Sequence, residues 1–249
     1  MTRTLERILL VVGVAIVPFD AVLRVGPVRV TAAEGILTIG IAIWLSRKVL
    51  ERGALPRLPH LLPMVAFVGA SFLSAAFAAH WTASLREGIQ FCWMFLLFLM
   101  ISEQGATEEL FPMFAGALLL PAVLSSVAGI VQHALFREPL DFLISPDRLR
   151  AYGFYSQPNA LGNFLSAMLP LVIGWYLISG SADGDARDGR RSQLARPWIL
   201  MSATFLLALA LLLTFSRGSW LGFSAGMLVF AAAARPRQSL YSLRLPLAA

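Results

Sequence analysis

Residues 197–234 read PWILMSATFLLALALLLTFSRGSWLGFSAGMLVFAAAA and contain a single charge, Arg217, near the middle. As one α-helix this stretch would be about 57 Å long, whereas the hydrocarbon core of a bilayer is roughly 30 Å thick. Burying an arginine at the centre of a membrane helix would also cost roughly 2.5 to 3.5 kcal/mol. We therefore predict two antiparallel spans joined by a tight turn at Ser216–Ser219, with Arg217 at a membrane surface.

The composition of the whole chain agrees with a membrane protein. Hydrophobic residues make up 58% of the 249 residues and charged residues 14%, which is too little polar surface to cover a soluble globule. The few charges cluster between apolar runs, as expected of a polytopic helical bundle. The net charge of +6 comes mostly from residues beside these runs, where it orients spans, so we do not expect nucleic-acid binding.

The uncharged runs predict an all-α fold, a polytopic transmembrane bundle of about eight spans in one membrane domain, residues 1–249. Five runs are long, and three near the N-terminus carry charges at their ends that could snorkel to the interface. The predicted spans are residues 5–22, 31–45, 61–79, 85–102, 110–132, 159–179, 197–215 and 218–234.

The distribution of Lys and Arg predicts the orientation. On alternate sides of the eight spans, thirteen of these residues fall on the side of the N-terminus and seven on the other. By the positive-inside rule the N-terminus is then cytoplasmic, as is the flexible linker 180–196. The long loop 133–158 and the turn at Arg217 face outward.

That loop ends in RLRAYGFYSQPN, residues 148–159, where a helix should begin. Asn159 is a good cap for the first turn, and we weigh this structural role equally with a functional one. An outward helix N-terminus beside Arg148 and Arg150 is also a sound anion site. Because Arg217 repeats the arrangement at the start of the last helix, we predict one shared site for a diphosphate. The alternative for Arg217 is a plain interfacial turn with a snorkelling side chain.

Other features point to structure. Gly218, Gly222 and Gly226 form a ladder of small residues that should let another helix approach closely. Thr31 and Glu34 have the spacing of a capping box.

Few residues suit acid, base or metal chemistry. Cys92 is the single cysteine and lies in an apolar run, which excludes a disulfide framework. Of three histidines, only His80 and His133 should face outward, and an isolated interfacial histidine is usually incidental. We expect no metal and no other cofactor, since no ligand cluster or phosphate loop occurs in the sequence.

One resemblance unites the two arginine motifs. Arg150, Gly153-Phe154 and Pro158–Gly162, followed by Ser216–Gly222, resemble the bacterial O-antigen ligase and O-antigen polymerase family. The resemblance covers best the region from about Arg150 to Ala234, and the earlier spans match in hydropathy and number.

The family implies a multi-pass glycosyltransferase of the bacterial inner membrane, in lipopolysaccharide or surface-glycan assembly. It would transfer a glycan from undecaprenyl diphosphate to an acceptor, the lipid A-core in a ligase, on the periplasmic side. By this resemblance Arg217 and Arg150 are the catalytic residues that stabilise the charge of the diphosphate, a metal-independent form of catalysis. We expect the diphosphate to be bound also by Arg148, Ser216, Gly218, Ser219, Asn159 and Gln157.

The chain departs from the family at its end. Members continue into a large periplasmic loop with a histidine thought to activate the acceptor, whereas this chain ends at Ala249, so we expect a truncated enzyme. An O-antigen polymerase and a protein O-oligosaccharyltransferase remain alternatives. A non-enzymatic transporter or lipid-binding membrane subunit is the alternative of another class.

Overall fold

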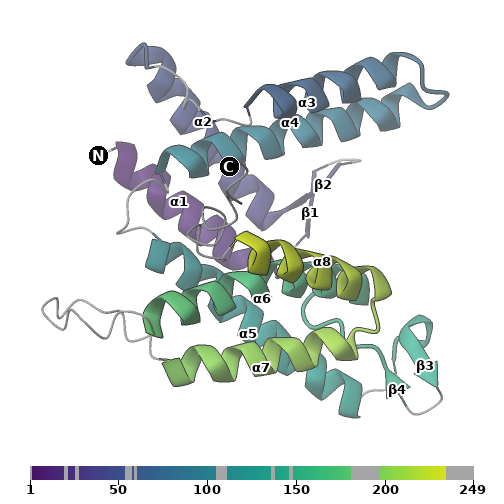
Figure 1. The fold of residues 1–249 in the computed structure, drawn as a ribbon. Coiled ribbons are helices and arrows are strands. Elements are labelled where there is room, and N and C mark those ends of the chain that lie inside the picture. Colours follow the sequence, from purple (N-terminus) through teal and green to yellow (C-terminus); the bar gives the residue numbers. More distant parts are fainter. Residues whose placement is uncertain are drawn as a thin grey trace, which may run out of the picture. The chain divides into compact units, whose positions relative to one another are not determined.

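The computed structural model describes residues 2–19, 22–25, 28–53, 58, 61–104, 111–135, 138–145, 148–180 and 197–233. These residues are mostly helical (Figure 1). The helices are α1 (Thr2–Ile16), α2 (Ala32–Leu50), α3 (Leu61–Ala76), α4 (Trp81–Gln104), α5 (Phe111–Leu135), α6 (Pro158–Gly180), α7 (Pro197–Leu213) and α8 (Arg217–Ala233).

Each apolar run predicted as a span overlaps one of these helices, which agrees with the predicted all-α fold, although α1 ends at Ile16 and the first run was predicted to continue to residue 22. That all eight helices span a membrane stays a prediction. Within the described residues, three helices are long and apolar enough to cross a membrane: α4, α5 from Pro112, and α6 as far as Leu177. The apolar helices α3 and α7 have 16 and 17 residues, so at 1.5 Å per residue they reach about 24 to 26 Å. The hydropathy of the sequence therefore predicted where the helices lie. Their lengths separate the helices that can cross a membrane from the shorter apolar ones.

Two short β-hairpins accompany the helices and were not predicted. Strand β1 (Val22–Val25) pairs with β2 (Val28–Thr31), and β3 (Leu143–Ser145) pairs with β4 (Arg148–Leu149), both antiparallel. A short 3-10 helix, Leu140–Phe142, precedes β3. The purely helical prediction was made from apolar runs, and such runs do not report strands of two to four residues between helices.

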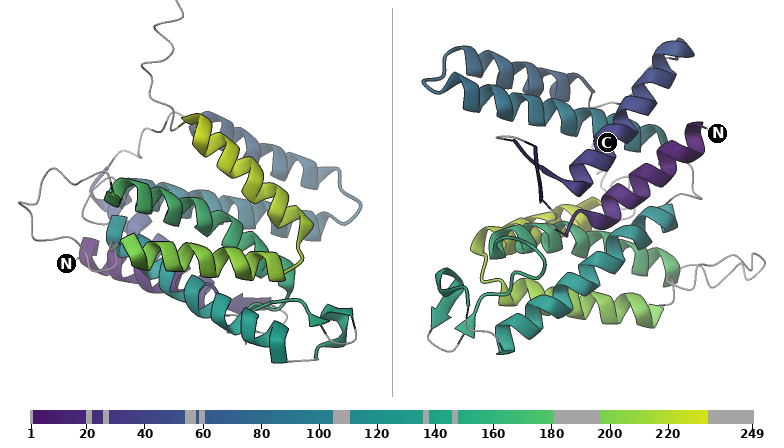
Figure 2. Two further views of the ribbon diagram at one scale, coloured as in Figure 1. Left: turned by 60° about the horizontal axis from the view of Figure 1, so that its bottom comes forward. Right: turned by 180° about the vertical axis from the view of Figure 1, so that it is seen from behind.

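The chain divides into two compact units, residues 1–118 and 119–249, and the boundary falls within α5. In the first unit α1 packs on α2, and α3 runs beside α4 (Figures 1 and 2). The core of this unit contains Trp44 and Leu10 with other buried apolar side chains of α2 and α4. The single membrane domain expected from the sequence stays a prediction.

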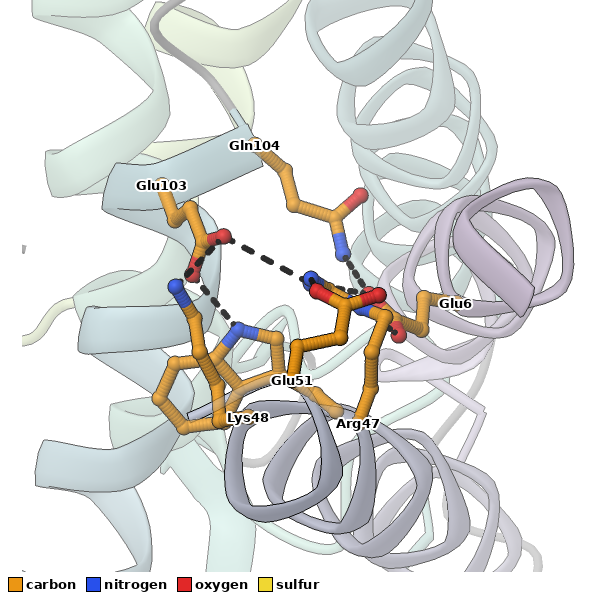
Figure 3. Close-up of polar contacts among 7 residues, drawn as sticks. Glu6, Arg47, Lys48, Glu51, Glu103 and Gln104 are labelled. Carbon is orange, nitrogen blue, oxygen red and sulfur yellow. Dashed lines mark hydrogen bonds and ion pairs between the residues drawn. The ribbon is translucent and has the colours of Figure 1, made fainter. Parts of the chain in front are cut away.

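An ionic cluster joins α1, α2 and α4 in the first unit (Figure 3). We use this name for Glu6, Arg47, Lys48, Glu51, Glu103 and Gln104. Glu6 is fully buried and accepts hydrogen bonds from Arg47 Nε at 2.7 Å and Arg47 Nη2 at 3.1 Å. Lys48 Nζ lies 2.9 Å from a carboxylate oxygen of Glu103. The start of α1 and the ends of α2 and α4 therefore meet at one end of this unit.

In the second unit α6 packs against α7 and α8 (Figure 2). The closest approach occurs at Gly162, where an added Cβ would lie 2.7 Å from Ser219 Oγ and 3.0 Å from Ser216 Cβ. The ladder predicted on α8 makes no such contact within the described part of this unit: at Gly218, Gly222 and Gly226 an added Cβ would meet nothing within 4 Å. Its role in close packing stays a prediction. Packing depends on which face meets a neighbour, and spacing alone does not identify that face.

The capping box at the start of α2 was predicted correctly. The Thr31 side chain accepts a hydrogen bond from the backbone N–H of Glu34 at 3.1 Å, and the Glu34 carboxylate accepts one from the backbone N–H of Thr31 at 2.8 Å. This reciprocal pair satisfies two backbone donors left free at a helix start.

Candidate anion-binding site

The two arginine motifs meet in the second unit. After β4 the backbone crosses the connection between α7 and α8, and the backbone N–H of Ala151 donates to the carbonyl of Leu213 at 2.8 Å. Arg150 Nε donates to the carbonyl of Thr214, also at 2.8 Å. The segment that leads into α6 is thus bonded directly to the turn that leads into α8.

Arg150 makes a second contact, with the start of α6. Its Nη2 atom donates to the side-chain oxygen of Asn159 at 2.7 Å. Asn159 was weighed as the cap of this helix, but α6 begins one residue earlier, at Pro158. The carbonyl of Gln157 accepts the first bonds of the helix, from Ala160 N at 3.1 Å and Leu161 N at 3.5 Å. The Asn159 side chain therefore orients Arg150.

The connection between α7 and α8 is a tight turn, as predicted, but it lies at Thr214–Ser216, and α8 already begins at Arg217. Phe215 has a φ of 51°, a left-handed conformation that reverses the chain direction in few residues. The fully buried Thr214 supports the turn, because its hydroxyl donates to the carbonyl of Leu211 at 2.7 Å and accepts from Ser216 N at 3.2 Å.

The two serines of this motif are buried between helices. Ser219 Oγ donates to the side-chain oxygen of Asn163 on α6 at 2.8 Å, and Ser216 Oγ lies 2.8 Å from Ser219 Oγ. A hydroxyl has one hydrogen to donate, so Ser216 must be the donor within the serine pair. Ser219 thus holds α6 against α8, and Ser216 orients the Ser219 hydroxyl. As diphosphate ligands these serines stay a prediction, and their observed bonds position the helix starts.

A second set of bonds holds the segment before α6 on α5. Gly153 has a φ of 60°, and its N–H and carbonyl both bond to the Gln132 side-chain amide at 2.8 Å. An added Cβ at Gly153 would lie 2.7 Å from the carbonyl oxygen of Ser125. Only glycine combines this backbone conformation with this close approach.

Three arginines occur in the segments at the two helix starts. Arg148 on β4 and Arg217 at the first position of α8 are exposed, and Arg150 is half-buried. None of the three forms an ion pair with a carboxylate among the described residues. Arg150 uses two of its five N–H donors in the bonds given above. Unneutralised guanidinium groups beside two helix N-termini make this region suited to an anion.

His133, near the end of α5, belongs to the same region. Its Nδ1 atom is hydrogen-bonded to the backbone carbonyl of Leu149, and its ring stacks on Phe215 with centroids 6.2 Å apart. A carbonyl can only accept, so Nδ1 carries the hydrogen and Nε2 of the neutral ring is an acceptor. The second outward candidate, His80, precedes α4 and belongs to the first unit. His60 lies outside the described residues.

Several residues that build this region were missed from the sequence. The backbone carbonyl of Thr214 accepts a hydrogen bond from Arg150, and the side-chain oxygen of Asn163 accepts one from Ser219. The side-chain amide of Gln132 donates to the carbonyl of Gly153. Nothing in their local sequence indicates these partners, which lie 64, 56 and 21 residues away along the chain. Thr214 lies inside the quoted stretch 197–234, but a backbone carbonyl makes no demand on residue type.

No protein-family model matches this chain, and no significant match is found among the curated proteins or the solved structures. Groups of three or more His, Cys, Asp or Glu side chains that could hold a metal ion do not occur within the described ranges.

Proposed function

We propose that this protein binds the diphosphate of an undecaprenyl-diphosphate-linked glycan at the starts of α6 and α8, as the donor site of an O-antigen ligase-type glycosyltransferase. One observation carries the proposal. The hydrogen bond from Arg150 Nε to the Thr214 carbonyl joins the first motif of the family resemblance to the turn that leads directly into the second. The candidate anion site therefore lies in the part of the chain that resembles this family.

The chemistry needs stabilisation of a leaving group. When an acceptor hydroxyl attacks the anomeric carbon of the glycan, the bond to the diphosphate oxygen breaks, and undecaprenyl diphosphate leaves with the electron pair. The proton of the hydroxyl passes to the departing diphosphate or to water. Arg217 and the unused donors of Arg150 would bind the phosphoryl oxygens, and Arg148 would add positive charge. Planar guanidinium groups donate two parallel hydrogen bonds to phosphate and keep their charge at every relevant pH. Donors fixed before the reaction are the effective ones.

The proposal includes eight spans in the bacterial inner membrane with a cytoplasmic N-terminus. Within the first unit the ionic cluster brings together the start of α1 and the ends of α2 and α4. Within the second unit, His133 at the end of α5 stacks on Phe215 of the α7–α8 turn, and Asn163 near the start of α6 bonds to Ser219 of α8. Helices that cross a membrane alternately must meet in this way, which supports the topology inside each unit. The Lys and Arg distribution supports its direction.

The proposal is tested with the full chain in lipid nanodiscs and undecaprenyl diphosphate as the ligand. We expect Arg217→Ala and Arg150→Ala each to weaken binding about tenfold or more, as the loss of a charge-assisted hydrogen bond predicts. Arg86→Ala removes an exposed arginine of the first unit and should leave the affinity unchanged. Equal affinity in all three variants would show that the diphosphate does not bind here.

A second assay separates an enzyme from a lipid-binding subunit. The same preparations receive undecaprenyl-diphosphate-linked glycan and lipid A-core, and the transferred glycan is measured. Transfer that falls in both arginine variants supports the ligase. Tight binding that depends on the arginines, without transfer to any acceptor even when a complete C-terminal region is supplied, would favour the non-enzymatic alternative.

A further inference from the structure

Two arginines of α1 stand apart from the ionic cluster. Within the cluster, Arg47 contacts the carboxylates of Glu6, Glu51 and Glu103, and Lys48 pairs with Glu103 (Figure 3). The cluster contains three carboxylates and two cationic side chains, so its net charge is −1. Arg3 and Arg7, one helical turn apart on α1, form no ion pair within the described part of the chain. With these two arginines the region holds four cationic side chains and three carboxylates, which leaves one positive charge in excess.

Arg7 is also incompletely bonded. Its Nε atom is buried from solvent and has no hydrogen-bond partner among the described residues. A buried donor without an acceptor is costly, and more so when it is charged. Arg3, Arg7 and residues of the ionic cluster line a cavity of about 40 Å³. That volume holds a small polar group and no larger ligand.

The same Arg7 lies at the edge of an apolar groove. The groove, about 330 Å³ in volume, is lined by Thr4, Arg7, Ile8, Val11 and Val12 of α1 and by Met113 of α5. The α1 residues recur at spacings of three and four and so share one helix face. Ile8 and Val12 are 53% and 42% exposed, so the groove opens outward. A polar, positively charged cavity and an apolar groove thus meet at one side chain.

We propose that this composite site on α1 binds an anionic glycerophospholipid, with the phosphate at Arg3 and Arg7 and one acyl chain along the Ile8–Val12 groove. Basic pockets between membrane helices bind acidic headgroups in this way, and the long arginine side chain can reach a headgroup from within the interface. The charge excess argues for an anionic headgroup, and the groove argues for a ligand that carries a chain. This site lies in residues 1–118 and does not rest on the proposed function.

The headgroup contact is tested by native mass spectrometry of the full chain in detergent, with phosphatidylglycerol and phosphatidylcholine of identical acyl chains. We expect the wild-type protein to prefer phosphatidylglycerol and this preference to fall about tenfold in Arg7→Ala. Arg7→Lys, which keeps the positive charge, should retain part of the preference. Arg86→Ala should leave it unchanged. Equal retention of the two lipids, or an equal loss in Arg86→Ala, would overturn the proposal. Circular dichroism checks that each variant keeps its helical content.

The acyl-chain contact is tested separately. Val12→Trp fills the groove at an exposed position, and Val65→Trp makes the same change at a 49% exposed valine of α3 outside it. We expect only Val12→Trp to weaken phosphatidylglycerol binding. An excess of inorganic phosphate should leave the lipid bound. The same loss in both tryptophan variants would show that the groove does not contribute to binding. Complete displacement of the lipid by phosphate would show that the site binds a free anion instead of a lipid.

Discussion

Arg150 Nε donates a hydrogen bond to the backbone carbonyl of Thr214 at 2.8 Å, across 64 residues of sequence. The bond fixes the end of the β3–β4 region on the turn between α7 and α8. Since Arg150 also binds Asn159 at the start of α6, one side chain connects the entrances of two helices. This arginine therefore has a structural role, whatever ligand its remaining donors bind.

We expect Arg150→Ala to destabilise the protein. It removes two hydrogen bonds of a charged, half-buried group, which together should contribute about 1 to 3 kcal/mol to the free energy of unfolding. Arg150→Lys can replace one of them and should have an intermediate effect. Thermal unfolding in detergent, followed by circular dichroism, measures both variants. Wild-type stability in Arg150→Ala would contradict the assigned contacts.

Arg217 should behave in the opposite way. It is exposed and has no hydrogen-bond or ion-pair partner among the described residues, so Arg217→Ala should change stability by less than about 0.5 kcal/mol. The affinity of the Arg217→Ala variant for the diphosphate should nevertheless fall, as proposed above. The same unfolding experiment gives the stability, and a large loss would mean that Arg217 supports the turn instead of a ligand.

Gly162 and Gly222 form a matched pair of helical glycines. Gly162→Ala would place a methyl group 2.7 Å from Ser219 Oγ, and we expect a loss of about 1 to 3 kcal/mol as α6 and α8 separate. Gly222→Ala meets no neighbour and should be neutral or stabilise by up to about 1 kcal/mol, because alanine favours a helix. Denaturant titration of both variants compares them. The reverse order would show that α8 packs through its glycine ladder.

His133 should exist as the Nδ1–H tautomer when neutral, because Nδ1 faces the carbonyl of Leu149. Nitrogen-15 chemical shifts of selectively labelled histidine identify the tautomer directly. His133→Asn can keep a donor near the Nδ1 position and should lose less stability than His133→Ala, which removes the bond worth about 1 kcal/mol. An Nε2–H tautomer, or equal losses in the two variants, would contradict this assignment.

The phenol of Tyr155 should titrate late. Its hydroxyl is buried without a hydrogen-bond partner in the described structure, and burial raises its pKa above the ordinary value of about 10. Above that pH the unfolded chain loses this proton while the folded chain keeps it, so stability should fall as pH rises. Tyr155→Phe should remove this alkaline contribution. Stability measured from pH 8 to 11 in both proteins checks the difference, and parallel curves would exclude the effect.

Sequence reasoning located the helices because hydropathy is a local property. A run of apolar residues must leave water wherever it lies in the fold, and the α7–α8 reversal followed from the length of one run and one arginine. The capping box of α2 was equally local, since its two residues are three positions apart.

Partners distant in sequence could not be found in that way. The buried pair of Glu6 and Arg47 joins residues 41 apart, and neither helix alone indicates that Glu6 is fully buried. Gly162 was not distinguished from the glycines of α8, because a glycine matters for packing only on the face that meets another helix.

By itself, then, the sequence determined where the chain forms apolar helices and that two arginine motifs precede two of them. The tertiary structure decided that these motifs meet, that Asn159 and the Thr214 carbonyl hold Arg150, and that Ser219 of the second motif binds α6. The physical reason is the range of the interactions. Transfer of a segment out of water depends on its own composition, whereas a hydrogen bond depends on the position of a partner that only the folded chain supplies.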